Sequence, residues 1–157
     1  MKPKKDYSER NDIEKIQSNW TKINGLFKRK EWSSAILRAS TAVEISANYV
    51  VRQELENNKN LEPDFVNHLL KWANGVQGKF DKLLIPIFKG SEFQKELKKL
   101  NKKVRDINKE RNLIAHSGQF KKKSTAEKVI KESEIVINTL IKKYEVEFEL
   151  KKKDENR

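Results

Sequence analysis

Two residues in the C-terminal half of the chain, Arg111 and His116, could act together on a phosphodiester. Four residues separate them, and Gly118 follows two positions after the histidine. Arginine is a permanent cation whose planar fork suits phosphate oxygens. Histidine can give and take a proton near neutral pH. Such a pair could hold a phosphodiester and move its protons without a metal ion.

The spacing of this pair requires that a helix end close to it. On a straight α-helix, residues five positions apart point about 140° away from each other. Gly118 predicts the end, because a left-handed cap residue is least strained as glycine. His116 would then lie at the C-terminal end of the helix, a suitable place for a general acid. A plain helix end with a surface arginine and a capping histidine has the same sequence.

Two polar residues could support the pair. Asn112 directly follows the arginine, where it could hold the phosphate or a water network, or help to end the helix. Glu44 lies in an earlier predicted helix and could orient Arg111 or His116. It could equally face solvent or an interface, so its role stays open.

Basic residues surround the predicted site. Arg105 and Lys109 fall near the line of Asn112 and His116 at helical spacing, which could make a phosphate track. Three further cations follow the histidine in the next loop, and they could clamp an RNA backbone: Lys121, Lys122 and Lys123. A solvated basic helix face would have the same pattern.

The composition predicts one helical domain. The 157 residues include only five glycines and three prolines, which favours long helices over a turn-rich β fold. There is no cysteine, which excludes disulfides, thiolate metal sites and a cysteine nucleophile. The two histidines lie far apart, which argues against structural zinc, and we expect no metal or cofactor.

The charge and the apolar pattern limit the classes of partner that the chain could bind. A net charge of +12 attracts polyanions, with nucleic acid as the first candidate. Lysine-rich, solvated helices would give the same charge. No apolar stretch follows the N-terminus, and the longest apolar run, Leu83 to Phe88, contains Pro86 and is too short to span a bilayer. We therefore expect a cytoplasmic protein with no membrane partner.

Apolar residues at steps of three and four predict the helices and their limits. Residues 1–8 are expected to be a flexible basic arm, 9–144 a single domain, and 145–157 a charged tail, disordered from Lys151. Ser124 and Glu127 predict a capping box at the start of the last helix. Asn74-Gly75 and Gly78 predict a turn. The predicted helices cover about residues 8–29, 32–56, 63–73, 91–115 and 124–144, with a short helix or irregular segment at 80–88.

The stretch Arg111-Asn112-Leu113-Ile114-Ala115-His116 resembles the motif of the HEPN family, an arginine and a histidine separated by four to six residues. The polar residue directly after the arginine is also found in many members. Residues 35–44, which include Glu44, resemble the first core helices of that family, and the resemblance spans roughly residues 10–144. It implies an all-α, HEPN-like bundle of four to five main helices that forms a symmetric dimer.

The resemblance also implies an activity. Many HEPN domains are metal-independent endoribonucleases, in which Arg111, His116 and Asn112 would be catalytic and Glu44 supporting. Cleavage needs a base for the ribose 2′-OH, a cation for the phosphorane and an acid for the 5′-oxygen. One chain offers one suitable histidine, and a dimer supplies two. Family members are commonly toxins or antiphage effectors, which implies RNA as substrate and an antitoxin or other regulatory protein as partner.

Two other functions fit the same sequence. Some HEPN-like domains have lost catalysis and serve as dimerisation or nucleotide- or RNA-binding modules. A basic helical adaptor could instead bind another protein through a surface at Trp32 or Trp72. Substitution of His116 separates these functions, because only the nuclease requires it for turnover.

Overall fold

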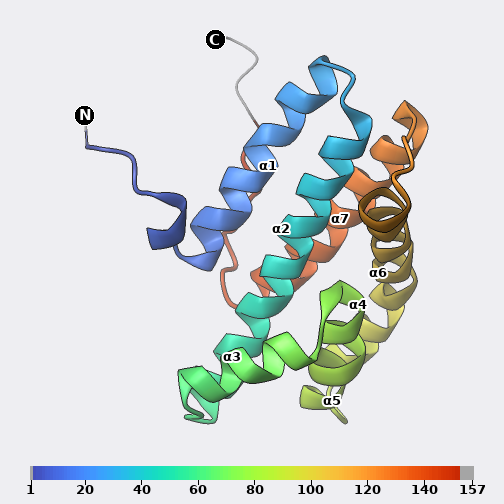
Figure 1. Cartoon of the computed structure of the whole chain (residues 1–157). Helices are drawn as coiled ribbons and strands as arrows, with labels where there is room; N and C mark the ends of the chain where they lie inside the picture. The colour runs from blue at the N-terminus through green and yellow to red at the C-terminus, as the bar shows by residue number, and fades with distance from the viewer. Residues whose placement is uncertain (1, 153–157) are drawn as a thin grey trace.

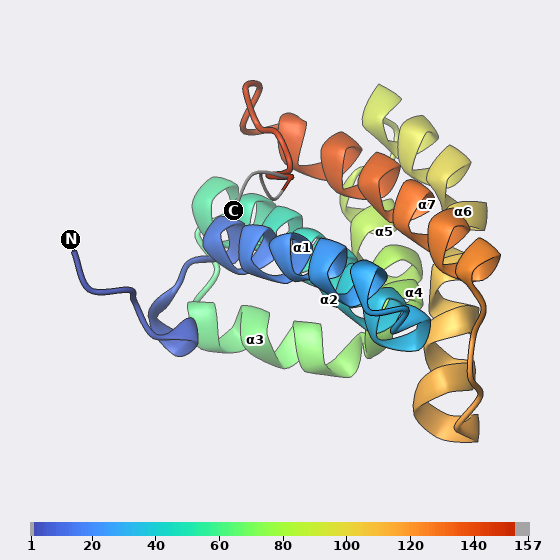
Figure 2. The same cartoon turned by 90° about the horizontal axis from the view of Figure 1, so that it is seen from above.

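A central helix, α2 (Trp32–Arg52), organises the fold in the computed structural model, which describes residues 2–152. Helix α1 (Asp12–Lys28) and helix α7 (Lys123–Lys142) both pack against α2 (Figure 1). Helix α6 (Glu92–Ser117) packs against α7 and also contacts α2. Seen from above, α1 lies against α2 and α7 lies against α6 (Figure 2). Residues 2–152 contain helices, turns and loops but no strand, so the predicted all-α class is confirmed.

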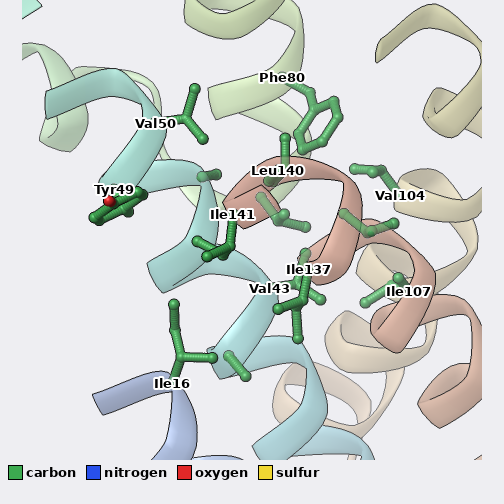
Figure 3. Close-up of a cluster of buried hydrophobic side chains, with 14 of the residues drawn as sticks. Ile16, Val43, Tyr49, Val50, Phe80, Val104, Ile107, Ile137, Leu140 and Ile141 are labelled. Atoms are coloured by element: carbon green, nitrogen blue, oxygen red, sulfur yellow. The ribbon is translucent and has the colours of Figure 1, made fainter. Parts of the chain in front are cut away.

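Small residues let the neighbouring helices approach α2 closely. Ala35, Ala39, Ala42 and Ala47 are fully buried in it, and short side chains at a helix contact shorten the distance between the axes. Larger side chains fill the space around this stripe (Figure 3). The labelled core residues come from four of the long helices and from the segment after α4, and they include Ile16, Val43, Val50, Phe80, Val104, Ile107, Ile137, Leu140 and Ile141.

The N-terminal helix begins later than predicted. Asn11 caps α1: its side-chain oxygen accepts a hydrogen bond from the Glu14 N–H at 2.8 Å, and the Glu14 carboxylate accepts one from the Asn11 N–H. This capping box fixes the start at Asp12. A 3₁₀ turn (Tyr7–Glu9) precedes it, and the Tyr7 hydroxyl accepts a hydrogen bond from Asn19. The predicted basic arm therefore contacts α1.

The middle of the chain forms short helices. A π-helical segment (Gln53–Asn58) prolongs α2, where the sequence predicted a loop from residue 56. Helix α3 (Pro63–Trp72) begins at its proline and ends as predicted. Helix α4 (Gly75–Lys79), a second π-helical segment (Phe80–Leu84) and α5 (Ile85–Ile87) follow. Gly78 lies inside α4 and not in the predicted turn. A Cβ atom there would lie 3.2 Å from the Ala73 backbone.

The two ends of the α6–α7 hairpin differ in how well they were predicted. Ser91 caps α6 through its hydroxyl, and Gly118 ends the helix with φ +60°, the end that the sequence predicted. The predicted capping box of α7 is wrong. The helix begins at Lys123, and its cap residue, Lys122, makes no side-chain capping bond. Ser124 therefore lies within the first turn.

The segment after α7 returns to α1. Phe148 and Leu150 are buried against the core. The Gln17 side chain donates to the Glu149 carbonyl at 2.7 Å and accepts from the Lys151 N–H at 2.8 Å. The predicted tail thus packs on the bundle as far as Lys151, and residues 153–157 of that prediction lie outside the described residues. None of the helices between residues 2 and 152 has the length and apolar character to cross a membrane.

Candidate functional site

The predicted pair meets at the C-terminal end of α6. The Arg111 Nη1 atom lies 3.4 Å from the His116 Nε2 atom. Both residues belong to the helix, which ends one residue after His116, and the long arginine side chain spans the distance between their positions on it. Arg111 is half-buried and His116 is exposed. The helix end therefore brings a permanent cation and a titratable ring into contact at the surface.

Asn112 orients the guanidinium group. Its side-chain oxygen accepts a hydrogen bond from Arg111 Nη1 at 3.2 Å. Among residues 2–152, Arg111 makes no ion pair with a carboxylate. Within this part of the chain, the guanidinium group makes polar contacts only with Asn112 and His116 and keeps its charge uncompensated. It therefore remains available to an anion such as a phosphate.

The contact between Arg111 and His116 fits one form of the imidazole ring. A guanidinium N–H can donate to Nε2 only when that nitrogen has no proton, which places the ring proton on Nδ1. This neutral form can accept a proton from a substrate hydroxyl at Nε2 once the Arg111 N–H turns from that nitrogen to a phosphate oxygen, because Nε2 has only one lone pair. After protonation the ring has two donors and no acceptor, so Nε2–H would need another partner, such as a phosphate or leaving-group oxygen.

A cleft of about 270 Å³ adjoins the pair. Helix α2, the start of α4 and the last turns of α6 form its walls, and these three helices contact one another. In Figure 1, α4 lies between α2 and α6. The lining residues are mostly polar: Ser40, Glu44, Asn74, Gly75, Val76, Gln77, Asn108, Arg111, Asn112 and His116. The structure thus brings Glu44 to the same cleft as Arg111, Asn112 and His116.

Glu44 has a different partner from those predicted. Its Oε1 atom accepts a hydrogen bond from Lys79 Nζ at 3.1 Å. The Lys79 side chain is only 5% exposed, and it also donates to the Leu70 and Ala73 carbonyls at the end of α3. A buried ammonium group requires such partners. Glu44 therefore anchors the cation that joins α2, α3 and α4, and it reaches Arg111 and His116 only across the cleft.

The predicted RNA-binding cations separate into different surroundings. Lys121 is the most constrained, because Nζ lies 2.8 Å from the Glu110 carboxylate and its backbone N–H donates to the Ser33 hydroxyl. Its charge is compensated, and it fixes the loop after α6 to both α6 and α2. Lys122 and Lys123 are exposed, so both are accessible to an RNA backbone, and their contact with RNA stays a prediction.

The predicted track along α6 divides between two surfaces. Arg105 is exposed on α6. Lys109 lines a separate hollow between α6 and α7, together with Asp106 and Lys128. Asn112 and His116 line the cleft instead. The four residues thus do not share one groove, although RNA contacts by Arg105 and Lys109 remain a prediction.

Several lining residues were not predicted. Asn108 lies one turn before Arg111 and Asn112, and Ser40 lies one turn before Glu44, so helical spacing could have indicated both. Asn74 and Gln77 come from a different element, and only the packing of α4 brings them to the cleft. Nothing in the sequence distinguishes Lys79 from Lys82, which stands three residues later in the same segment, so the buried position of Lys79 could not be predicted.

The comparisons with known proteins add no relative. No protein-family model, curated protein or solved structure matches this chain. Within residues 2–152, no cluster of three or more histidine or acidic side chains has a geometry that could hold a metal ion.

Proposed function

We propose that this chain is a metal-independent endoribonuclease of the HEPN type, with Arg111 and His116 as its catalytic pair. The observation that carries this proposal is the 3.4 Å contact between Arg111 Nη1 and His116 Nε2 at the mouth of a polar cleft. The pair combines a guanidinium without a carboxylate partner and a ring in a form that can accept a proton. These are two of the three groups that metal-free RNA cleavage needs.

The mechanism assigns one step to each group. His116 in its neutral form removes the proton from the ribose 2′-OH, whose oxygen then attacks the adjacent phosphorus. Arg111 stabilises the added charge on the phosphorane oxygens through its fork, and Asn112 holds the guanidinium in place. The bond from phosphorus to the 5′-oxygen breaks, which leaves a 2′,3′-cyclic phosphate and a 5′-hydroxyl end.

The third group is an acid for the leaving 5′-oxygen, and we propose that a second copy of the chain supplies it. His116 is exposed at the end of α6, where another molecule can approach. A symmetric dimer that joins two such ends would place two Arg111–His116 pairs at one composite site. One His116 would then act as base and its counterpart as acid.

The proposed biological role is that of a toxin or antiphage effector in the cytoplasm. A nuclease with an exposed site requires control, so a cognate antitoxin or other regulatory protein is the expected partner. The HEPN-like arrangement itself is part of this proposal. It is supported by the contact between α2, which carries Glu44, and α6, which carries the pair.

The test compares the two histidines of the chain. Wild-type protein, His116→Ala and His68→Ala are each incubated with total RNA and with a defined tRNA in EDTA. His68 is exposed on α3, so it provides a matched control. Cleavage by wild type and His68→Ala but not by His116→Ala supports the proposal. No cleavage by folded, dimeric wild-type protein would contradict it.

One feature favours a second candidate, a nucleotide- or RNA-binding module without turnover. The cleft offers carboxamide and hydroxyl groups that can bind a nucleotide whether or not cleavage follows. In that case wild type and His116→Ala would bind RNA with similar affinity, and neither would cut it.

A further inference from the structure

The cleft beside the catalytic pair has the chemistry of a nucleobase site. Four of its ten lining residues carry a carboxamide group: Asn74, Gln77, Asn108 and Asn112. Carboxamides donate and accept hydrogen bonds in one plane, and they match the edges of bases. In single-stranded RNA these edges are free to be read.

The same cleft is poorly suited to a second phosphate. Arg111 is the only permanent cation among its lining residues, and the Glu44 carboxylate stands in the opposite wall. A phosphate held by Arg111 at the mouth would therefore leave the rest of the cleft to an uncharged group. In an RNA strand, that group is the base or ribose of a nucleotide next to the phosphate.

Two of the carboxamides, those of Asn74 and Asn108, have no group that is engaged in a hydrogen bond with another described residue. Within residues 2–152, the side chains of Asn74 and Asn108 make no hydrogen bond, whereas Gln77 donates to Asp81 and Asn101. The α4 and α6 walls lie close together at Gly75, where a Cβ atom would be in van der Waals contact with Asn108 Oδ1 at 3.6 Å. Asn74 and Asn108 thus face a ligand from two sides of the cleft.

Glu44 gives the cleft a preference among bases. Lys79 occupies Oε1 of Glu44, and Oε2 makes no hydrogen bond within the described part of the chain. A carboxylate accepts well from the exocyclic amino groups of adenine, cytosine and guanine. In uracil the single ring N–H lies between two carbonyl oxygens, which a carboxylate would repel.

We infer that this cleft receives the base of a nucleotide that flanks the cleaved phosphodiester, and that it favours an amino-bearing base over uracil. Asn74, Asn108 and Glu44 determine this specificity. The inference rests on the proposed function, because the pair at the mouth defines which phosphodiester is cleaved. It adds that cleavage is selective for sequence.

The test uses deoxyoligonucleotides that contain a single ribonucleotide, so that only one 2′-OH can attack. The base of the ribonucleotide and the base of the deoxynucleotide after it are varied one at a time. Adenine, guanine, cytosine and uracil are tested at each position. At one of these two positions we expect rates to differ by about tenfold or more, with the uracil-containing substrate among the slowest. Asn74→Ala with Asn108→Ala should reduce that ratio toward one. Asn58→Ala, an exposed asparagine outside the cleft, should keep it. Equal cleavage of all four bases at both positions would overturn the inference and leave the nuclease standing.

A binding experiment separates the inference from the proposed function. His116→Ala is titrated with fully deoxy oligonucleotides that carry the same base changes and cannot be cleaved. If wild type cuts nothing but these oligonucleotides still bind with a base preference that the asparagine substitutions abolish, the nucleobase site stands and the nuclease falls. Binding that is equal for all four bases, or absent, would contradict the inference.

Discussion

The Lys79 ammonium group lies 3.1 Å from a carboxylate oxygen of Glu44 and within 3.3 Å of the Leu70 and Ala73 carbonyl oxygens. One buried cation therefore holds α2, the end of α3 and α4 together. These contacts set the position of α4, which forms one wall of the cleft. The shape of the cleft depends on Lys79, although Lys79 does not contact Arg111 or His116.

Replacement of Lys79 by methionine should destabilise the protein. A fully buried pair that loses one partner costs roughly 3–5 kcal/mol, and we expect about 2 kcal/mol here because the Glu44 side chain is 36% exposed. Urea unfolding of Lys79→Met measures this change. Lys82→Met, an exposed lysine three residues later, should change the free energy of unfolding by less than about 0.5 kcal/mol. Equal stability of Lys79→Met and wild type would show that the buried contacts do not hold α4.

Arg111 should be needed for the rate of cleavage. Removal of one donor to a developing oxyanion costs about 10²–10³-fold in rate, and we expect this loss for Arg111→Ala. Arg111→Lys should recover only part of it, because an ammonium group lacks the planar fork. Arg105→Ala removes an exposed arginine of the same helix; loss of its predicted RNA contact could weaken binding, but the single-turnover rate at saturating RNA should be kept. A similar loss in both alanine variants would point to general RNA attraction and away from a catalytic role.

Glu132 should lower the stability of the protein at neutral pH. Burial raises the pKa of Glu132 above its ordinary value of 4.5, against the opposing effect of Lys128. The folded state thus binds a proton at Glu132 more tightly than the unfolded state does. The stability that the protonated Glu132 contributes is present below pH 4.5 and is lost as the pH rises through the pKa of the folded state. Glu132→Gln should be more stable than wild type at pH 7 by less than about 1 kcal/mol.

The matched control for this change is Glu127→Gln. Glu127 also has a lysine four residues before it, but it is exposed. Its substitution should leave stability nearly unchanged. Thermal unfolding at pH 7 and at pH 4 compares the variants, and the advantage of Glu132→Gln should disappear at the lower pH. An advantage of equal size at both pH values would exclude the charge as its cause.

Two tyrosines should make the protein sensitive to alkali. Burial, assisted by the Glu145 carboxylate, raises the pKa of Tyr49 to about 12. Burial and the hydrogen bond to Glu54 also raise the pKa of Tyr144 well above its ordinary value of 10.0. The unfolded chain ionises near pH 10, so the stability from both groups is present below pH 10 and is lost as the pH rises above it.

Stability measured by chemical unfolding from pH 8 to pH 11.5 tests this expectation. The free energy of unfolding should fall above pH 10, and Tyr144→Phe should make that fall shallower. The variant should also lose about 1 kcal/mol at pH 8, because Glu54 loses its donor. Tyr7→Phe provides the control for the pH dependence alone, since Tyr7 is exposed but its hydroxyl accepts a hydrogen bond from Asn19. An unchanged pH dependence in Tyr144→Phe would show that Tyr144 does not titrate with unfolding.

The helix pattern could be predicted from the sequence, and so could the helix ends that a glycine or a proline marks. Gly118 indicated the end of α6 because its left-handed conformation excludes most other residues, and Pro63 indicated the start of α3 for a similar local reason. The Arg111–His116 contact was expected from that helix end, but both residues lie within α6 and the long arginine side chain makes the contact. The prediction of a capping box in α7 was wrong although Ser124 and Glu127 fit the pattern, because the helix already begins at Lys123.

The composition of the cleft could not be predicted, because it depends on packing between distant segments. Asn74 and Gln77 reach the site only through the position of α4, which follows from the buried contacts of Lys79. Glu44 was expected near the pair, but nothing local indicated that Lys79, 35 residues later, would be its partner. Phe148 and Leu150 were assigned to a charged tail, and their burial shows that two apolar residues can anchor a segment rich in charge.

The central claim is that the Arg111–His116 pair cleaves RNA by attack of the 2′-OH. To test it, the folded protein is incubated in EDTA with a deoxyoligonucleotide that contains one ribonucleotide, and the product masses are determined. We expect a cut only after the ribonucleotide, with a 2′,3′-cyclic phosphate on one product and a 5′-hydroxyl on the other. The all-deoxy oligonucleotide and the His116→Ala variant should give no product. A 5′-phosphate product, a cut elsewhere in the strand, or no cleavage by the folded wild-type protein would contradict RNA cleavage by this pair.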